Sequence, residues 1–476
     1  MHLGDFNMQP SSNNPQKPLR LVWRAAIIGA CIGGAFSAAF SLRPSPPTQV
    51  PTPPAALTGE QTLALIVPPK GGSATERALL QTLAKARAKT EEPSNWVNLG
   101  DALAQMLRDT ADEKYYDHAE SAYQFALRLQ PSNVDALIGM AWVTGGRHQF
   151  EQSREWANRA LALDSENASA HGIIGDAALE LGDYEAAYER YQTMMDLKPD
   201  LSSWSRGAQL LHITGVTTKA IWLMEKAIKA GAPFAENTAW CRAKLAMMLF
   251  SQGALIPAAQ ALEPSLKAES KNAHVLLAAG RIAAAREDYT GARKYFNVLL
   301  AGGPNHDALV ALGDLSAYDG DKLEAEKYYA QVEALEAAQS ARTGHSHMAM
   351  AKFYADHDRK PIEALRMAEA RKLTRNVYEA DTLAWVYFKN GDQPRAIEAI
   401  KRALSQNTQD AEIHFHAGMI AAKFGDRASA QKHLQQAINL NPRFSLLQAP
   451  IAAAMLETLG GTSAANATKR EAGVVK

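Results

Sequence analysis

The feature that most constrains this chain is a repeat of about 34 residues between Ser94 and Phe444. The clearest copy runs from His171 to Pro199, where Gly182 turns the chain between two helical stretches and Pro199 ends the second. A hairpin of that length has an apolar face that only neighbouring hairpins can cover. With about ten such copies, residues 93–444 are expected to form an all-α solenoid.

Charge and cysteine content exclude several classes of function. Fifty Lys and Arg residues balance fifty Asp and Glu residues, so the chain has no net charge with which to attract nucleic acid. Cys31 and Cys241 are the only cysteines, too few for a disulfide framework or a cysteine-rich zinc site. Because the net charge is zero, we expect no nucleic-acid partner.

The residues within each copy resemble the pattern of the tetratricopeptide repeat family. Each well-preserved copy has a large residue and a Leu–Gly pair in its first helix, then two alanines around an aromatic residue in its second. The resemblance implies a right-handed superhelical solenoid of helix-turn-helix repeats. The first copy carries Trp96, Leu99, Gly100, Ala119, Tyr123, Ala126 and Pro131.

An uncharged apolar stretch, residues 25–42, follows three basic residues near the N-terminus. As a helix it would span about 27 Å, close to the thickness of the hydrocarbon core of a bilayer. The excess of basic residues before it predicts a single-pass segment with residues 1–24 in the cytoplasm. A signal peptide cleaved near Ser41 and a cytosolic helix are the alternatives. Gly29 and Gly33 have the GxxxG spacing that permits a homodimer.

The other segments are assigned by composition. Prolines and glycines predict an extended linker after the apolar stretch, and small polar residues predict a disordered tail. The expected segments are the linker at 43–74, a leading helix at 75–92, a capping helix at 445–459 and the tail at 460–476.

In the family that these repeats resemble, the first helix of each repeat lines a concave groove. That mapping implies an apolar, aromatic groove, suited to an extended peptide or an amphipathic helix of a partner protein. The alternative is that several of these side chains belong to the core between repeats. The expected groove residues are Trp240, Met247, Phe250, Phe353, Trp385, Phe388, Lys389, Phe415 and Met419, with Asp176, Arg281, Asp314, Asp381 and Lys423 as scattered charges.

Neither catalysis nor metal binding has a clear motif. The sequence has no nucleophile elbow, no phosphate-binding loop and no HExxH motif. The candidate metal ligands are His345, His347 and His357, and the pair His414 and His416. Residues two apart on a helix diverge by about 200°, so such a pair does not chelate unaided. We expect no enzyme activity, no cofactor and no metal.

The last repeats also resemble bacterial exported repeat proteins, in the stretches from Asp381 to Leu404, from His414 to Asp426 and from Asn441 to Ser445. The leading hypothesis is a non-enzymatic scaffold or assembly factor of the bacterial cell envelope. It would be anchored in the inner membrane, with the repeats in the periplasm or secreted after signal cleavage, and would hold a protein partner in the groove. The alternative is a periplasmic small-ligand or metal-binding accessory protein that serves a transporter.

Overall fold

The computed structural model describes residues 58–460, apart from 111, 234, 269–270 and 344–347. Every regular element in these residues is an α-helix, as expected, and twenty of the 23 helices form ten antiparallel hairpins. Two helices precede the hairpins and one follows them. The helices before and in the first five hairpins are α1 Gly59–Ala64, α2 Ala74–Ala88, α3 Pro93–Thr110, α4 Lys114–Leu129, α5 Val134–Gly146, α6 Phe150–Leu163, α7 Ala168–Glu180, α8 Tyr184–Leu197, α9 Leu201–Ile213, α10 Thr217–Ala230, α11 Glu236–Ser251 and α12 Leu255–Lys267.

The remaining helices continue the same alternation. They are α13 Ala273–Ala285, α14 Tyr289–Leu300, α15 His306–Tyr318, α16 Lys322–Thr343, α17 Met348–Asp356, α18 Pro361–Glu369, α19 Val377–Lys389, α20 Gln393–Ala403, α21 Ala411–Lys423, α22 Arg427–Leu440 and α23 Gln448–Thr458.

A glycine and an aromatic ring set the spacing within a hairpin. Gly100 of α3 faces the ring of Tyr123 in α4, and a Cβ added to this glycine would lie 2.4 Å from a ring atom. The hydroxyl of Tyr123 donates to the neighbouring Asp101 at 2.7 Å. The same Gly–Asp pair and tyrosine recur in later hairpins. They are Gly175, Asp176 and Tyr191, and then Gly313, Asp314 and Tyr329.

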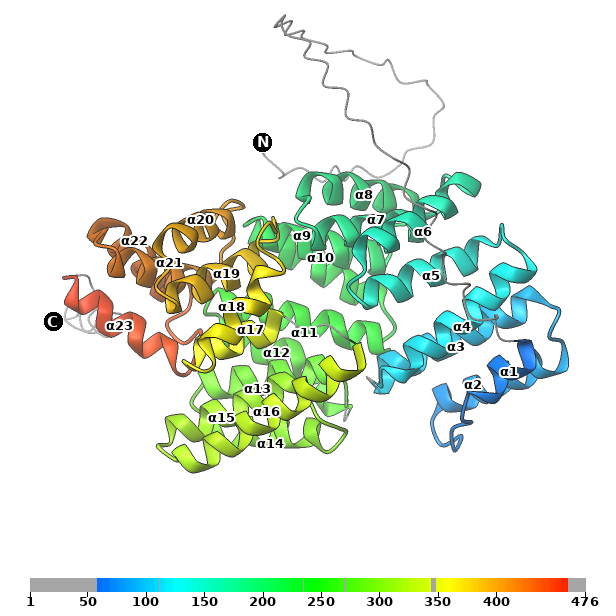
Figure 1. The fold of residues 1–476 in the computed structure, drawn as a ribbon, viewed down its shortest axis with the longest axis horizontal. Helices are drawn as coiled ribbons and strands as arrows, with labels where there is room; N and C mark the ends of the chain where they lie inside the picture. The colour runs from blue at the N-terminus through cyan, green and yellow to red at the C-terminus, as the bar shows by residue number, and fades with distance from the viewer. Residues whose placement is uncertain (1–57, 111, 234, 269–270, 344–347, 461–476) are drawn as a thin grey trace, which may run out of the picture.

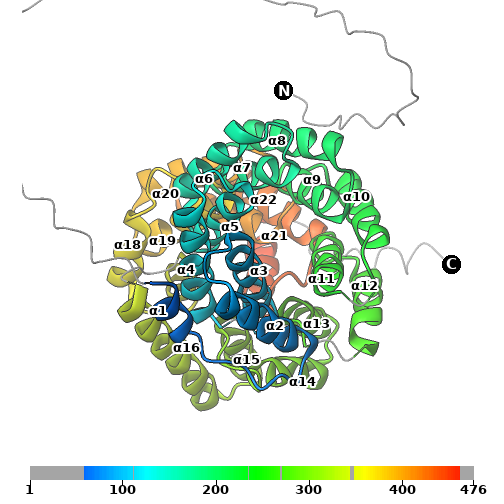
Figure 2. The same ribbon diagram turned by 90° about the vertical axis from the view of Figure 1, so that its right-hand side faces the viewer.

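Viewed along its axis, the solenoid forms a ring, with α8 to α10, α11 to α16 and α18 to α20 following one another around it (Figure 2). The later hairpins then lie against the earlier ones. The side chain of Asn376, before α19, donates to the carbonyl of Glu180, 196 residues earlier. The amide of Val377 donates to the hydroxyl of Tyr184, and Thr408 donates to the carbonyl of Ile213. We call this contact between successive turns the seam (Figure 1).

Three glycines at the seam permit this approach. Gly182 and Gly215 follow α7 and α9 with φ of +75° and +79°, and Gly253 follows α11 with φ of +70°. A Cβ on Gly182 would lie 2.3 Å from the carbonyl carbon of Arg375, and a Cβ on Gly215 would lie 2.3 Å from the carbonyl oxygen of Asn407. Gly391, with φ of +74°, has no atom within 4 Å of such a Cβ. The positive φ favours glycine at all these turns, although His148 and Glu287 adopt it in other hairpins, and only the seam positions also require glycine for contact.

Several of the predicted segments can be compared with the helices of the structure. Helix α2 lies mostly within residues 75–92, the range expected for a leading helix, and α23 lies within residues 445–459, the range expected for a capping helix. The segment expected to be linker contains a short helix, α1, which Thr58 caps by accepting a hydrogen bond from the amide of Gln61. The expected membrane segment 25–42, with Gly29 and Gly33, and nearly all of the expected tail lie outside the described residues. Within the described part, none of the helices is long and apolar enough to cross a bilayer.

Candidate functional site

The ring encloses a cavity of about 830 Å³, which we call the lumen cavity. Its wall is made by the first helices of successive hairpins, α9, α11, α13, α15 and α17, and by the start of α21. A volume of this size is typical of sites that hold small molecules or a few side chains of a partner. The lumen cavity is therefore the candidate binding site.

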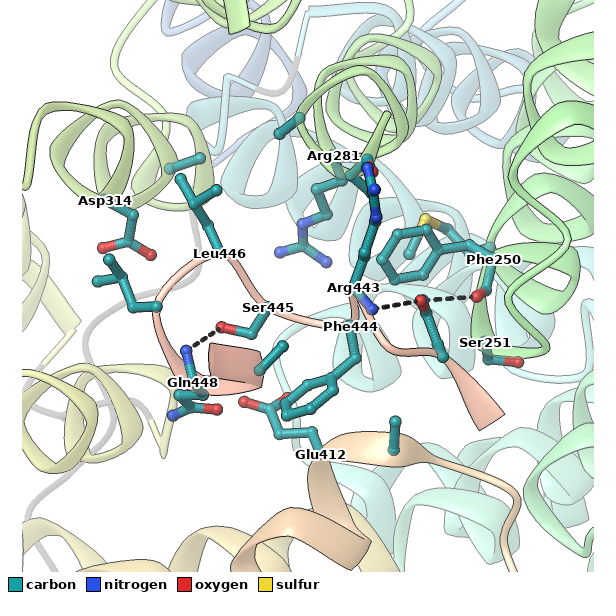
Figure 3. A pocket seen from close by; sticks show the side chains of 18 of the residues that line it. Phe250, Ser251, Arg281, Asp314, Glu412, Arg443, Phe444, Ser445, Leu446 and Gln448 are labelled. Atoms are coloured by element: carbon teal, nitrogen blue, oxygen red, sulfur yellow. Dashed lines mark hydrogen bonds between the residues drawn. The ribbon is translucent and has the colours of Figure 1, made fainter. Parts of the chain in front are cut away.

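A segment of the chain itself, made mostly of turns, crosses this cavity (Figure 3). We call it the strap, residues 441–448, which join the end of α22 to the first residue of α23. The side-chain amide of Asn441 donates to the carbonyl of Phe250 at 2.8 Å, and the guanidinium of Arg443 donates to the carbonyl of Ala285 at 3.0 Å. Gln448 donates to Asp356 at 2.9 Å. The strap is held by polar contacts to helix ends, much as a bound peptide would be.

Three of the nine expected groove residues line the lumen cavity: Met247, Phe250 and Phe353. Met247 is half-buried, whereas Phe250 and Phe353 are 9% and 2% exposed, so they contribute mostly to the wall. Trp240 is half-buried on α11, with its ring 5.3 Å from the ammonium of Lys244. Around α11, the predicted groove therefore coincides with the cavity.

The other expected groove residues lie on α19 and α21. Trp385 and Phe415 are 4% and 1% exposed, and both belong to one hydrophobic core cluster of the C-terminal repeats. Phe388 and Met419 are half-buried against the same cluster, and Phe388 stacks on Trp385 at 4.8 Å. Lys389 pairs with Asp358. For Trp385 and Phe415 the alternative assignment, core between repeats, describes the structure, because their rings offer little surface to a partner.

Beside the strap lies a buried network of charges. The ammonium of Lys352 contacts the carboxylates of Asp356 at 2.6 Å and Glu412 at 2.5 Å. Nδ1 of His416 lies 3.0 Å from both carboxylate oxygens of Asp381. Lys352 and Glu412 are 60 residues apart, so no local sequence pattern signals the network. Their spacing follows from the stacking of α17, α19 and α21.

One oxygen each of Asp356 and Glu412 and one nitrogen of His416 lie within 4.8 Å of one another. An imidazole with two carboxylates suits several divalent metals. However, the ammonium of Lys352 bonds to both carboxylates and so takes the place of a cation. Of the other histidines considered, His357 pairs with Asp314 at 2.7 Å, whereas His345 and His347 lie outside the described residues.

Burial and charge divide the histidines into two groups. Burial disfavours protonation of His416, but the carboxylate of Asp381 outweighs it and raises the pKa above its usual 6.5. Burial, aided by the nearby Lys244, lowers the pKa of His212 to about 4. Burial raises the pKa of Glu412, but Lys352 outweighs this effect and brings it to about 2. The ion pairs of the network thus favour the charged forms of His416 and Glu412.

A histidine titration should separate these groups. We expect His357 and His416 to titrate above pH 6.5, and His212, His274 and His414 at about 4. His357 and His416, in their protonated forms, stabilise the fold below pH 6.5. This contribution is lost as the pH rises through their raised pKa values. The other three contribute above pH 6.5, and their contribution is lost as the pH falls towards 4. Carbon-13 NMR of labelled imidazoles measures each value; a His416 pKa below 6.5 would contradict its pairing.

Comparison with known families identifies the repeats. Residues 138–201, 257–307 and 382–443 match the family model described as Tetratricopeptide repeat. These three stretches are therefore similar to tetratricopeptide repeats, as the sequence pattern implied. The matched stretches lie in the early, middle and late hairpins of the solenoid.

Among curated proteins, a formate-dependent nitrite reductase complex subunit, NrfG, of Escherichia coli O157:H7 is 30% identical over 124 residues. The match covers 25% of this chain and 59% of that protein. The CTR9 homologue of Arabidopsis thaliana is 31% identical over 116 residues, which are 24% of this chain and 10% of that protein. This chain thus spans little more than half of the first relative and a tenth of the second.

Among solved structures, a human IFIT1 dimer with m7Gppp-AAAA has a TM-score of 0.48 at 15% identity, covering 69% of this chain and 77% of that one. Pseudomonas aeruginosa pilF has a TM-score of 0.33 at 23% identity, covering 45% of this chain and 93% of that one. Neither likeness bears on function at these scores.

Proposed function

We propose that this chain is a non-enzymatic scaffold of the bacterial cell envelope that binds an extended segment of a partner protein in its lumen cavity. The strap is the observation that carries the proposal. In the strap, a polypeptide segment lies against the first helices of the repeats and donates to the carbonyls of Phe250 and Ala285 and to one carboxylate. A partner segment with similar chemistry would use the same contacts.

Three further observations support this function. Tetratricopeptide repeats commonly bind protein partners, and repeat arrays present extended concave surfaces. One relative is, by its name, a subunit of a reductase complex. The apolar stretch 25–42 supports attachment to the inner membrane, with the N-terminus in the cytoplasm and the repeats in the periplasm.

A pair of matched variants tests the groove. Met247→Arg places a long charged side chain in the lumen cavity, whereas Ile256→Arg places the same charge on exposed α12 of the same hairpin, away from the cavity. The full chain is crosslinked in native membranes and purified, and attached proteins and its own N-terminus are identified by mass spectrometry. We expect a specific envelope protein with the native chain and with Ile256→Arg, and at least about tenfold less with Met247→Arg.

Thermal unfolding of each variant provides the control for folding. Equal recovery of the partner with both folded variants would place its binding site elsewhere. An N-terminus cleaved near Ser41 would replace the membrane anchor by a signal peptide.

A further inference from the structure

The hairpin of α13 and α14 departs from the Gly–Asp and tyrosine pattern that sets the spacing in three other hairpins. In α13 and α14, Gly280 faces Phe296 in place of a tyrosine, and Arg281 stands where the aspartate stands elsewhere. Phe296 has no hydroxyl group that could bind the residue after this glycine, so the side chain of Arg281 is free to face the lumen. The side chain of Arg281 is 49% exposed, and its ion pair, with Asp307, is long at 3.8 Å.

A second cation lies on the neighbouring helix α11. Lys244 also lines the lumen cavity, and its ammonium makes neither an ion pair nor a hydrogen bond with any residue that the structure describes. The ammonium nitrogen lies 5.3 Å from the centroid of the Trp240 ring. Burial lowers the pKa of Lys244, Glu180 opposes this shift, and the like charge of Arg281 adds to it. Lys244 and Arg281 are thus close enough to repel each other.

The acidic side chains of the same cavity are, by contrast, mostly satisfied. Asp314 accepts from Tyr329 and His357, and Glu287 pairs with Arg443 at 2.9 Å. Asp410 caps α21 by accepting from two backbone amides. The carboxylates of Asp356 and Glu412 share Lys352. Among the charged side chains that line the lumen cavity in the described chain, Lys244 is therefore the one with neither an ion pair nor a hydrogen bond.

His212 adds a third unsatisfied group to this part of the wall. It lines the lumen cavity from α9, and its Nδ1 is buried without a hydrogen-bond partner in the described chain. Buried polar atoms without partners are rare in folded proteins, and each calls for an explanation. A bound molecule with acceptor oxygens would provide partners for the two cations, and His212 lies in the same part of the wall.

We propose that Lys244 and Arg281 form a binding site in the lumen cavity for a small organic anion with a carboxylate or phosphate group. A ligand of this kind fits the cavity, whose volume of about 830 Å³ is that of a small-molecule site. Charge-assisted hydrogen bonds from the two cations replace the water molecules that hydrate the anionic oxygens, in a partly buried position. This site goes beyond the scaffold function and does not depend on a protein partner.

Isothermal titration of the full chain with citrate, succinate and inorganic phosphate tests the site at constant ionic strength. We expect saturable binding of at least one probe, with one site per chain. Lys244→Met and Arg281→Met should each weaken it by about tenfold or more, since a charge-assisted hydrogen bond contributes on that order.

The matched control is Lys226→Met. Lys226 also lies over a tryptophan, Trp222 at 4.4 Å, but on α10 and outside the lumen cavity. The variant Lys226→Met removes the same kind of charge and a cation–π contact. Its affinity for the anionic probes should therefore equal that of the native chain. Absence of saturable binding for all three probes, or equal affinities for Lys244→Met and Lys226→Met, would overturn the proposal. Thermal unfolding confirms beforehand that each variant is folded.

Discussion

Lys352→Met should lower the free energy of unfolding by about 3 kcal/mol. The substitution keeps the length of the side chain but removes the ammonium shared by Asp356 and Glu412. The two carboxylates then remain close together in a poorly hydrated place. Removing one member of a buried ion pair typically costs about 3 to 5 kcal/mol. We use the lower end because Lys352 is 30% exposed towards the cavity. Chemical denaturation with urea measures the change.

A surface ion pair provides the control for this prediction. Lys327 pairs with Glu324 across one turn of α16, and both side chains are well exposed. Lys327→Met should leave stability almost unchanged, because exposed pairs contribute little.

The double variant Lys352→Met with Glu412→Gln should recover part of the loss, since it also removes one of the uncompensated charges. Equal effects of Lys352→Met and Lys327→Met would show that the buried network does not hold the fold.

Gly182→Ala should destabilise the protein by about 2 to 5 kcal/mol. A left-handed backbone costs a residue with a Cβ about 1 to 2 kcal/mol, and overpacking adds about 1 to 3 kcal/mol. The new methyl group would meet the backbone of Arg375 and Asn376 at 2.3 and 2.5 Å, so one turn of the superhelix must move away from the next. Thermal and urea unfolding measure the loss of stability.

Gly391→Ala separates these two causes. Its φ of +74° almost equals the +75° of Gly182, but its Cβ would meet no atom within 4 Å. This variant should therefore show the backbone cost alone, about 1 to 2 kcal/mol. In small-angle X-ray scattering, Gly182→Ala should expand the particle while Gly391→Ala should not. If both variants lose the same stability and keep the same size, the seam contributes nothing to the closed ring.

Local patterns in the sequence predict the helices well. Gly100 and Tyr123 pack within one hairpin, at a spacing that recurs from repeat to repeat, so the hairpins could be counted before the structure was known. The caps follow the same logic, as Asn167 at the start of α7 shows by accepting a hydrogen bond from the amide of Ala170. Such contacts join residues close in sequence.

The candidate site was predicted only in part. Family resemblance placed Met247, Phe250 and Phe353 at the cavity wall, and it placed Arg281 among the scattered charges of the groove. It could not separate groove from core for Trp385, because an aromatic residue on the first helix fits both. That choice depends on how far each hairpin rotates against the next, a quantity that no single repeat encodes.

The sequence by itself determined the class of fold and the number of hairpins, because the contacts that define a repeat lie within it or with its neighbours. Only the tertiary structure decided that the superhelix closes on itself. The small rotation at each step accumulates until Asn376 reaches Glu180, 196 residues away, and until the strap enters the lumen. Which glycines are crowded, which charges meet and which remain unmatched follow from that accumulated geometry.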